Sequence, residues 1–327
     1  MKHFDELFPV IDRTSELLSE ELAIPYLDAL VATGENLFHG EIMQPVNEVL
    51  KKRLMKDYSS VSIGKYSKEE IRKSFQLAAL KGLKEGVEQH HSMTPDAVAL
   101  FVAYLVNKLT EGREEFSLLD PAVGTGHLLI AILNQLHKEV HAYGSEVENT
   151  FVKLTYVVAN LTEHPVELLH QDSLEPLMID PVDMVVCDLP VGYYPNDHRA
   201  ASFQLKAEEG HSYAHHLFIE QSLKHTKEGG SLIFIVPNHL FETEEAPKLN
   251  AFLKEQAIIL GLLQLPLTMF KQNQTGKSIL ILQKKGEGVT MPKQALLAEL
   301  PSFSNKSALE GMIQRIDRWF EMHIKYK

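Results

Sequence analysis

One acid and two glycines stand close together in the stretch LLDPAVGTGHLLIAIL, which runs from Leu118 to Leu133. The apolar run before Asp120 predicts a strand, and the apolar run after Gly126 is long enough for a helix. Gly124 and Gly126 let the backbone turn sharply and approach a ligand, while the start of the helix offers unpaired N–H donors. Asp120 adds a hydrogen-bond acceptor. We therefore expect a ligand site at the carboxyl edge of an α/β sheet.

The spacing of the glycines indicates which ligand this turn suits. A dinucleotide site needs G-x-G-x-x-G, but Leu129 stands where the third glycine would be. A phosphate-binding P-loop needs Gly-Lys-Ser/Thr, which does not follow. The remaining pattern, D-x-x-x-G-x-G, resembles the first motif of S-adenosylmethionine (SAM) dependent methyltransferases. The resemblance implies that SAM contacts Asp120, Pro121, Ala122, Val123, Gly124, Thr125, Gly126, His127 and Leu128.

Two further acids follow predicted strands. Glu146 closes the second strand about 20 residues past the glycine turn, where a carboxylate can accept from both hydroxyls of a ribose. Asp172 follows the third strand, where it could accept from an adenine amino group. Three acids in successive units favour a nucleoside site over unrelated surface caps. The neighbouring Val147 and Ser173 are expected to belong to the same site.

The fourth predicted strand ends in CDLPVGYYP, from Cys187 to Pro195. Its Asp-Leu-Pro-Val-Gly resembles the Asn/Asp-Pro-Pro-aromatic tetrapeptide, often followed by glycine, of amino-methyltransferases that modify adenine N6. Three other segments agree with this family: TPDAVALFVAYLV, EGGSLIFIVPNHLF and LLQLPLTMFKQNQTGKSILILQKK. Over roughly His90 to Lys285 the chain thus resembles the methylase subunit of type I restriction-modification systems. By this resemblance Thr94 and Pro95, before the first motif, also contact the cofactor.

The resemblance implies a chemical role for the tetrapeptide. An exocyclic amine is a poor nucleophile because its lone pair is delocalised into the ring. Acceptors for both N–H groups favour a tetrahedral nitrogen and aim its lone pair along the S–CH3 axis. Asp188 would offer one acceptor through its side chain and Leu189 another through its carbonyl, with Pro190 stiffening the loop.

The loop departs from the family pattern at two positions. Leu189 replaces the first proline, and Val191 replaces the aromatic residue that stacks on a base flipped out of its helix. We expect Tyr193 or Tyr194 to supply the stacking ring instead. The cofactor site follows the pattern more closely than the acceptor site does.

The surrounding sequence predicts the elements that position these residues. From His90 onward, strand patterns alternate with helix patterns, which indicates a parallel sheet. We predict an α/β fold: a doubly wound, mostly parallel, seven-stranded Rossmann-like sheet of the SAM methyltransferase type with an N-terminal helical domain. Residues 1–88 would form the helical domain and residues 89–327 the methyltransferase domain, with a helix at 306–324 packing on it.

The helical domain carries recognisable local signals. VNEVLKKRLM places Val46, Val49, Leu50 and Leu54 on one predicted face. Further along, Ser67 and Glu70 have the spacing of a capping box, which predicts a helix start.

Composition limits the possible classes. With 327 residues, one cysteine and a formal net charge of −12, the chain suits a soluble protein in a reducing compartment, and we expect a cytoplasmic location without membrane contact. No apolar run reaches the length of about 18 residues that a membrane-spanning helix needs. The acidic balance argues mildly against unaided DNA binding. The histidines lack zinc-site spacing, so no metal is expected.

Three functions stay open at this stage. The leading one is methylation of adenine N6 in DNA, with a partner or specificity subunit, since no segment is large enough for a separate recognition domain. The second keeps the same chemistry on RNA, on a protein amide or on a small molecule. The third is a SAM-binding regulatory protein that has lost methyl transfer.

Overall fold

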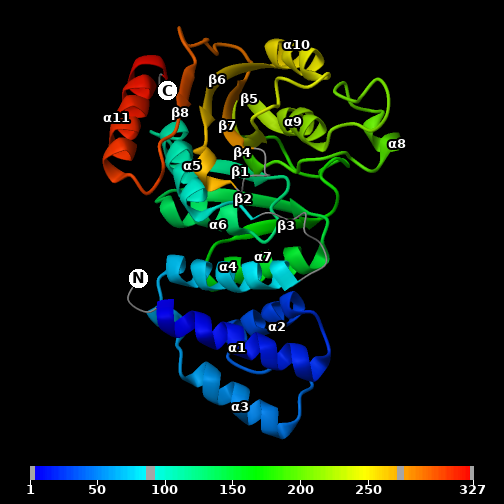
Figure 1. Cartoon of the computed structure of the whole chain (residues 1–327), viewed down its shortest axis with the longest axis vertical. Coiled ribbons are helices and arrows are strands. Elements are labelled where there is room, and N and C mark those ends of the chain that lie inside the picture. The colour runs from blue at the N-terminus through cyan, green and yellow to red at the C-terminus, as the bar shows by residue number, and fades with distance from the viewer. Residues whose placement is uncertain (1–3, 86–92, 271–275, 325–327) are drawn as a thin grey trace. The chain divides into compact units, whose positions relative to one another are not determined.

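The computed structural model describes residues 4–85, 93–270 and 276–324 of the chain (Figure 1). The α-helices are α1 (Phe4–Leu22), α2 (Tyr26–His39), α3 (Glu48–Ser59), α4 (Lys68–Glu85), α5 (Asp96–Leu109), α6 (His127–Gln135), α7 (Asn149–Leu161), α8 (Asp197–Ala200), α9 (Ala214–Lys224), α10 (Ala246–Gln256) and α11 (Lys306–His323). The strands are β1 (Glu115–Asp120), β2 (Glu139–Glu146), β3 (Val166–His170), β4 (Val182–Asp188), β5 (Thr226–Pro237), β6 (Ala257–Gln264), β7 (Lys277–Lys284) and β8 (Leu296–Glu299).

The strands form one sheet in the order β3-β2-β1-β4-β5-β7-β6-β8. The strand β4 lies between β1 and β5 and is parallel to both, whereas β7 is antiparallel to β5 and to β6. The predicted fold class, a mostly parallel α/β sheet with a helical N-terminal part, is confirmed. The sheet has eight strands where seven were expected, because the short β8 pairs in parallel with β6. Its four residues are too few to show a clear strand pattern in the sequence.

The central strands are apolar on both faces. In β4 four consecutive residues, Met184–Cys187, are buried, and β5 is buried from Ser231 to Pro237. Such runs are typical of parallel strands covered on both faces. Cys187 lies fully buried in this core.

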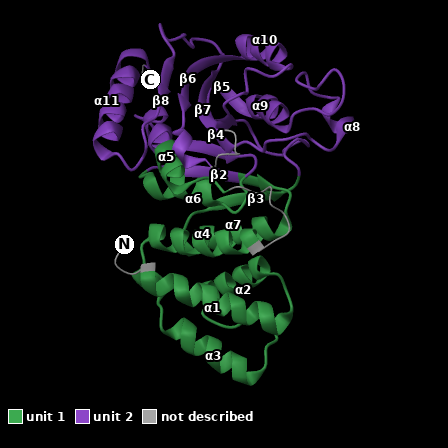
Figure 2. Ribbon diagram, viewed as in Figure 1, with its two compact units in different colours: residues 1–103, 123–137, 144–171 green, residues 104–122, 138–143, 172–327 purple. Residues whose placement is uncertain are grey.

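The chain divides into two compact units (Figure 2). Unit 1 comprises residues 1–103, 123–137 and 144–171, and unit 2 comprises residues 104–122, 138–143 and 172–327. The expected boundary near residue 88 stays a prediction. The division passes through the glycine turn after β1, so the predicted site residues from Asp120 to Ala122 belong to unit 2 and those from Val123 to Leu128 belong to unit 1.

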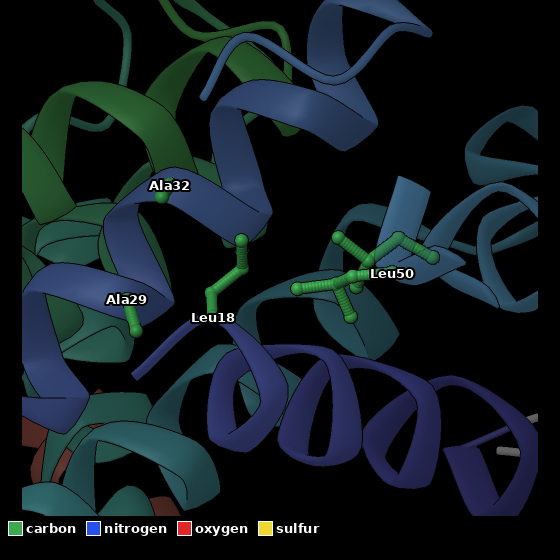
Figure 3. Packing of buried hydrophobic residues seen from close by; sticks show 5 residues of the cluster. Leu18, Ala29, Ala32 and Leu50 are labelled. Atoms are coloured by element: carbon green, nitrogen blue, oxygen red, sulfur yellow. The ribbon is translucent and has the colours of Figure 1, made fainter. Parts of the chain in front are cut away.

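The first helices of unit 1 pack around a small apolar cluster. It consists of Leu18, Ala29, Ala32, Leu50 and Leu54 (Figure 3). Leu50 and Leu54 belong to this cluster, as predicted. Val49 is 80% exposed, so the prediction that it lies on the same face as these leucines was wrong. The helix α3 begins at Glu48, and its buried stripe is too narrow to include Val49.

The predicted capping box at the start of α4 is confirmed. The backbone N–H of Glu70 donates to the Ser67 hydroxyl at 3.2 Å, and the Ser67 N–H donates to the Glu70 carboxylate at 3.0 Å. The C-terminal helix is also present as α11, with Ile316, Trp319 and Phe320 buried. Within residues 4–85, 93–270 and 276–324, no helix is long and apolar enough to cross a membrane.

Candidate functional site

In unit 1 the glycine turn has the backbone that its sequence predicts. Gly124 and Gly126 have φ values of +55° and +78°, in the left-handed region that favours glycine. A Cβ on Gly126 would lie 2.8 Å from the Thr155 side chain in α7, so only glycine fits there. A Cβ on Gly124 would meet no atom within 4 Å among the described residues. The turn is therefore open beside Gly124, where a ligand can approach the backbone.

The carboxylate of Glu146 is fixed by backbone donors of unit 1. The Gly124 N–H donates to Oε2 at 2.9 Å, and the N–H groups of Val147 and Glu148 donate to Oε1 at 2.8 and 3.0 Å. Glu146 is thus bound to the glycine turn at the carboxyl end of β2. Two ionised oxygens can accept more than three hydrogen bonds, so the group retains capacity for a ligand hydroxyl.

His127, the first residue of α6, belongs to a buried polar network. Its Nδ1 lies 2.6 Å from the guanidinium of Arg72, which also donates to the carboxylates of Glu69 and Asp96. Burial, followed by the positive charge of Arg72, lowers the pKa of His127 to about 3. His127 is therefore neutral at pH 7, and its ring connects α6 to α4.

The other predicted cofactor residues of unit 1 differ in exposure. Thr94 and Leu128 are buried, Thr125 is half-buried, and Pro95 and Val147 are exposed. Val123 is buried, and its N–H donates to the Ser145 carbonyl at 3.0 Å, which ties the turn to β2.

In unit 2, Asp120 ends β1 and is only 2% exposed. Its Oδ1 accepts from the backbone N–H of Ala122 at 3.1 Å, which closes the first bend of the turn.

Burial, with the nearby charges of Asp120 and Asp188, raises the pKa of the Cys187 thiol. Cys187 is therefore a protonated core residue and not a nucleophile.

Asp172 is held by two donors of unit 2. The Leu174 N–H donates to Oδ1 at 2.9 Å, and the Tyr194 hydroxyl donates to Oδ2 at 2.5 Å. Burial and this carboxylate raise the pKa of Tyr194. The neighbouring Ser173 is buried and donates to the carbonyl of Pro121. Tyr194 is 6% exposed, so it offers no accessible face to a base.

The loop after β4 begins with Asp188, whose side chain is 15% exposed. Its Oδ1 accepts from the ammonium of Lys277 at 2.7 Å. The N–H of Leu189 donates to the carbonyl of Ile235 in β5 at 3.1 Å, and the Leu189 side chain is buried. This buried side chain anchors the loop where the family pattern has a proline. Val191 points outward and is 53% exposed.

Tyr193 forms a stacked pair with Tyr213. The ring centroids are 5.1 Å apart, the planes lie within 14° of parallel, and an isolated β-bridge joins the two residues. Tyr193 is 64% exposed, which leaves ring surface for a further aromatic group. Of the two predicted stacking residues, Tyr193 is thus the accessible one.

Sequence reasoning missed Lys277 and Tyr213. Lys277 is the first residue of β7, and its signal was a lone cation immediately before the apolar run SILIL. Tyr213 precedes α9 and carried no local signal, because its relation to Tyr193 depends on the fold of the loop between them.

A hollow of about 370 Å³ lies elsewhere in unit 2, at the amino ends of β1 and β4. Asp183 lines it and accepts from Ser117 and Lys227. Burial alone would raise the pKa of Asp183, but these hydrogen bonds lower it to about 2. The hollow is at the opposite end of β4 from Asp188, so it has no part in the candidate site. Among the described residues no group of three or more His, Cys, Asp or Glu could hold a metal.

Comparison with known proteins agrees with this architecture. A Bacillus subtilis relative, named uncharacterized protein YtxK, is 48% identical over 323 residues and is covered to 98%, as is this chain. A solved Listeria monocytogenes structure, provisionally assigned to the class I SAM-dependent methyltransferases, is 45% identical with a TM-score of 0.91, over 98% of this chain and 99% of that one. The type I restriction-modification methyltransferase subunit of Streptococcus thermophilus shares the fold at 15% identity, with a TM-score of 0.64 over 96% of this chain and 74% of that one.

The sheet order, the glycine turn after β1 and these matches define a class I SAM-dependent methyltransferase. Residues 5–83 match the YtxK N-terminal helical domain. Residues 78–323 match the N-6 DNA methylase family, and the chain belongs to that family.

Proposed function

We propose that this chain transfers the methyl group of SAM to an exocyclic amine, and that its acceptor is adenine N6 in DNA. The observation that carries the proposal is the position of Asp188. Asp188 is the last residue of β4, the strand that pairs with β1. The loop that follows Asp188 presents the exposed Tyr193. An acceptor for N–H groups and an exposed ring thus occur within one short loop.

The residues at the strand ends fit SAM. In unit 1, the open backbone at Gly124 admits a ligand, and Glu146 is oriented to accept from ribose hydroxyls. In unit 2, Asp172 is oriented by Tyr194 and would accept from the adenine amino group of the cofactor. The remaining predicted residues of the turn would surround the cofactor through backbone and apolar contacts.

The chain's own groups would bind and orient the acceptor. Bound SAM supplies a methyl group on a sulfonium, which provides the driving force for transfer. The Asp188 carboxylate would accept one N–H of the amine and the Leu189 carbonyl the other, which localises the nitrogen lone pair. The hydrogen bond from the Leu189 N–H to the Ile235 carbonyl fixes the start of the loop against β5, next to this carbonyl. No base is needed before attack, because S-adenosylhomocysteine would leave as the methyl group is transferred and the nitrogen would lose its extra proton to the Asp188 carboxylate or to water only afterwards.

The exposed tyrosine pair supports a planar acceptor. Stacking on one aromatic side chain contributes about 1–3 kcal/mol per base. Tyr193, backed by Tyr213, would supply that surface in place of Val191.

The charge of the chain supports a partner. The formal net charge of −12 argues mildly against DNA binding without a partner, because DNA-binding proteins neutralise phosphates with basic side chains. We therefore propose that a second subunit supplies sequence recognition. We also propose that the protein acts in the cytoplasm, where the single buried Cys187 stays reduced.

One observation favours a second candidate function. Val191 is exposed and carries no ring, so the loop also suits a smaller acceptor such as a protein carboxamide, or an RNA base. A SAM-binding protein without transfer activity is the third alternative.

The experiment is to incubate the purified protein with methyl-labelled SAM and, separately, DNA, RNA or cell extract. Label recovered as N6-methyladenine in DNA would support the proposal, and label in RNA or protein would move the assignment to the second candidate. Asp188→Ala should lower transfer about a hundredfold or more while SAM still binds. Saturable SAM binding without label in any fraction, even with extract as a source of partners, would contradict an enzymatic role.

A further inference from the structure

The ammonium of Lys277 binds the residue that the proposed function places against the acceptor amine. Lys277 Nζ lies 2.7 Å from Asp188 Oδ1, and the two side chains are only 21% and 15% exposed. The strands fix this pair: Asp188 is opposite Ile235 in β5, and Lys277 is opposite Pro237 two residues further along the same strand. The contact therefore follows from sheet register and not from a flexible surface loop.

The ion pair changes what Asp188 presents to a ligand. The family pattern allows a neutral Asn or an anionic Asp at this position, and here the Asp is matched by a cation. A carboxylate alone beside a sulfonium would attract it and stabilise bound SAM before transfer. The ion pair of Asp188 and Lys277 has no net charge. Asp188 can therefore accept an N–H of the acceptor without also strengthening the binding of the SAM sulfonium.

The pair also combines an acceptor with a donor. A carboxylate can accept up to about four hydrogen bonds, and an ammonium has three N–H donors. Lys277 can therefore bind Asp188 and still donate to an atom of the acceptor. This arrangement complements an NH2 group whose carbon also carries an acceptor atom, as in the N6–N1 edge of adenine or in a carboxamide. An alkylammonium would instead meet the like charge of Lys277.

We propose that Lys277 is a positioning residue that neutralises and orients Asp188, and that the pair selects amidine-type or amide-type NH2 groups over alkylamines. The inference rests on the proposed function, because it takes Asp188 to lie beside the transferring methyl group. It assigns a role to a residue outside the tetrapeptide and gives a physical reason for the choice of acceptor.

The test compares the affinities of SAM, which is cationic at sulfur, and S-adenosylhomocysteine, which is not. Calorimetry would use the full chain as wild type, Lys277→Met, Lys277→Arg, Asp188→Asn and the Lys277→Met/Asp188→Asn double variant. Lys277→Met should raise the preference for SAM over S-adenosylhomocysteine by about three- to tenfold, because the Asp188 carboxylate then faces the sulfonium without the positive charge of Lys277. Asp188→Asn should lower the preference by a similar factor. The double variant and Lys277→Arg should return it close to the wild-type value.

A matched control exists at the other end of β4. Lys227 forms the same kind of pair with Asp183 at 2.9 Å, and Lys227→Met should leave the preference unchanged. Loss of packing alone would weaken the binding of SAM and of S-adenosylhomocysteine equally. If Lys277→Met still bound SAM but kept the wild-type ratio of the two affinities, the inference would be overturned. If the wild type bound neither ligand, the proposed function itself would fail. Label transfer to polylysine would also overturn the inferred acceptor class. Lys277→Gln serves if thermal unfolding shows that the methionine variant does not fold.

Discussion

The Tyr194 hydroxyl donates to Oδ2 of Asp172 at a distance of 2.5 Å. These residues come from the loops after β4 and β3, and the bond fixes the carboxylate that we expect to accept from the adenine of SAM. It also explains the burial of Tyr194, which sequence analysis had considered as a stacking residue. The ring supports Asp172 and is not available to the acceptor.

Tyr194→Phe removes this bond and keeps the ring. We expect the Kd for SAM to rise about three- to tenfold, because one hydrogen bond contributes about 1 kcal/mol and Asp172 loses its orientation. Calorimetric titration measures the change, and Tyr193→Phe is the matched control, since the Tyr193 ring is exposed. An unaltered affinity in Tyr194→Phe would show that Asp172 does not contact the cofactor.

Gly126→Ala tests the glycine turn. The substitution places a Cβ 2.8 Å from Thr155 and forces alanine to φ +78°, so we expect a loss of about 2 kcal/mol or more in the free energy of unfolding. Denaturant titration gives the value. Gly64→Ala is the control, because its added Cβ meets nothing within 4 Å among the described residues and its φ is not positive. Equal stabilities for the two variants would contradict the close approach to α7.

The sequence predicted the geometry of the glycine turn and of the α4 cap because their signals are local. Glycines in a turn, an acid at a strand end and the Ser67–Glu70 capping box each depend on neighbours in the chain, and the turn geometry and the cap are present in the structure. The β4–β7 relationship could not be predicted in this way. Lys277 follows Asp188 by 89 residues, and their contact depends on the register of three strands.

Burial at helix surfaces was harder to predict than helix positions. Val49 has the apolar character of a core residue but lies outside the buried stripe of α3. Arg72, in contrast, is charged yet only 1% exposed, because two carboxylates and His127 surround it. Periodicity cannot predict such a residue, since its burial depends on partners from other helices.

Arg72→Met tests this network. We expect a loss of about 2 kcal/mol or more, because Glu69 and Asp96 would lose their shortest contacts to a cation and keep only the longer ones to Lys73. Chemical denaturation measures it. Lys68→Met is the matched control: its pair with Glu163 is 3.6 Å long and exposed, so the change should stay within about 1 kcal/mol. Comparable small losses would mean that α4 is held by apolar packing alone.

Acid should destabilise the protein through buried histidines. Burial, with the charges of His216 and His239, lowers the pKa of His215 to about 3, and burial lowers that of His216 to about 4. An unfolded histidine titrates near about 6.5, so both rings are neutral in either state above that pH. Below it, the unfolded chain binds protons that the folded chain excludes. The contribution of these two histidines to stability is therefore complete above about pH 6.5 and is lost as the pH falls towards about 4 for His216 and about 3 for His215.

His215→Phe removes one of these titrating rings. The slope of unfolding free energy against pH should decrease by about 1.4 kcal/mol per pH unit between about pH 6 and 4. Urea titrations at several pH values measure the slope. A slope in His215→Phe equal to that of the wild type would show that the ring is protonated in the folded state.

Substitution of Tyr193 tests whether the acceptor is planar. Its ring is 64% exposed and stacks on Tyr213, so Tyr193→Ala should raise KM for a nucleic-acid acceptor about five- to a hundredfold, the equivalent of losing one base-stacking contact of about 1–3 kcal/mol. SAM affinity should not change, since no predicted cofactor contact is removed. Tyr193→Phe, which keeps the stacking surface, should remain close to the wild type. If Tyr193→Ala retained full activity, the acceptor would not stack on this ring, and a protein carboxamide would become the better assignment.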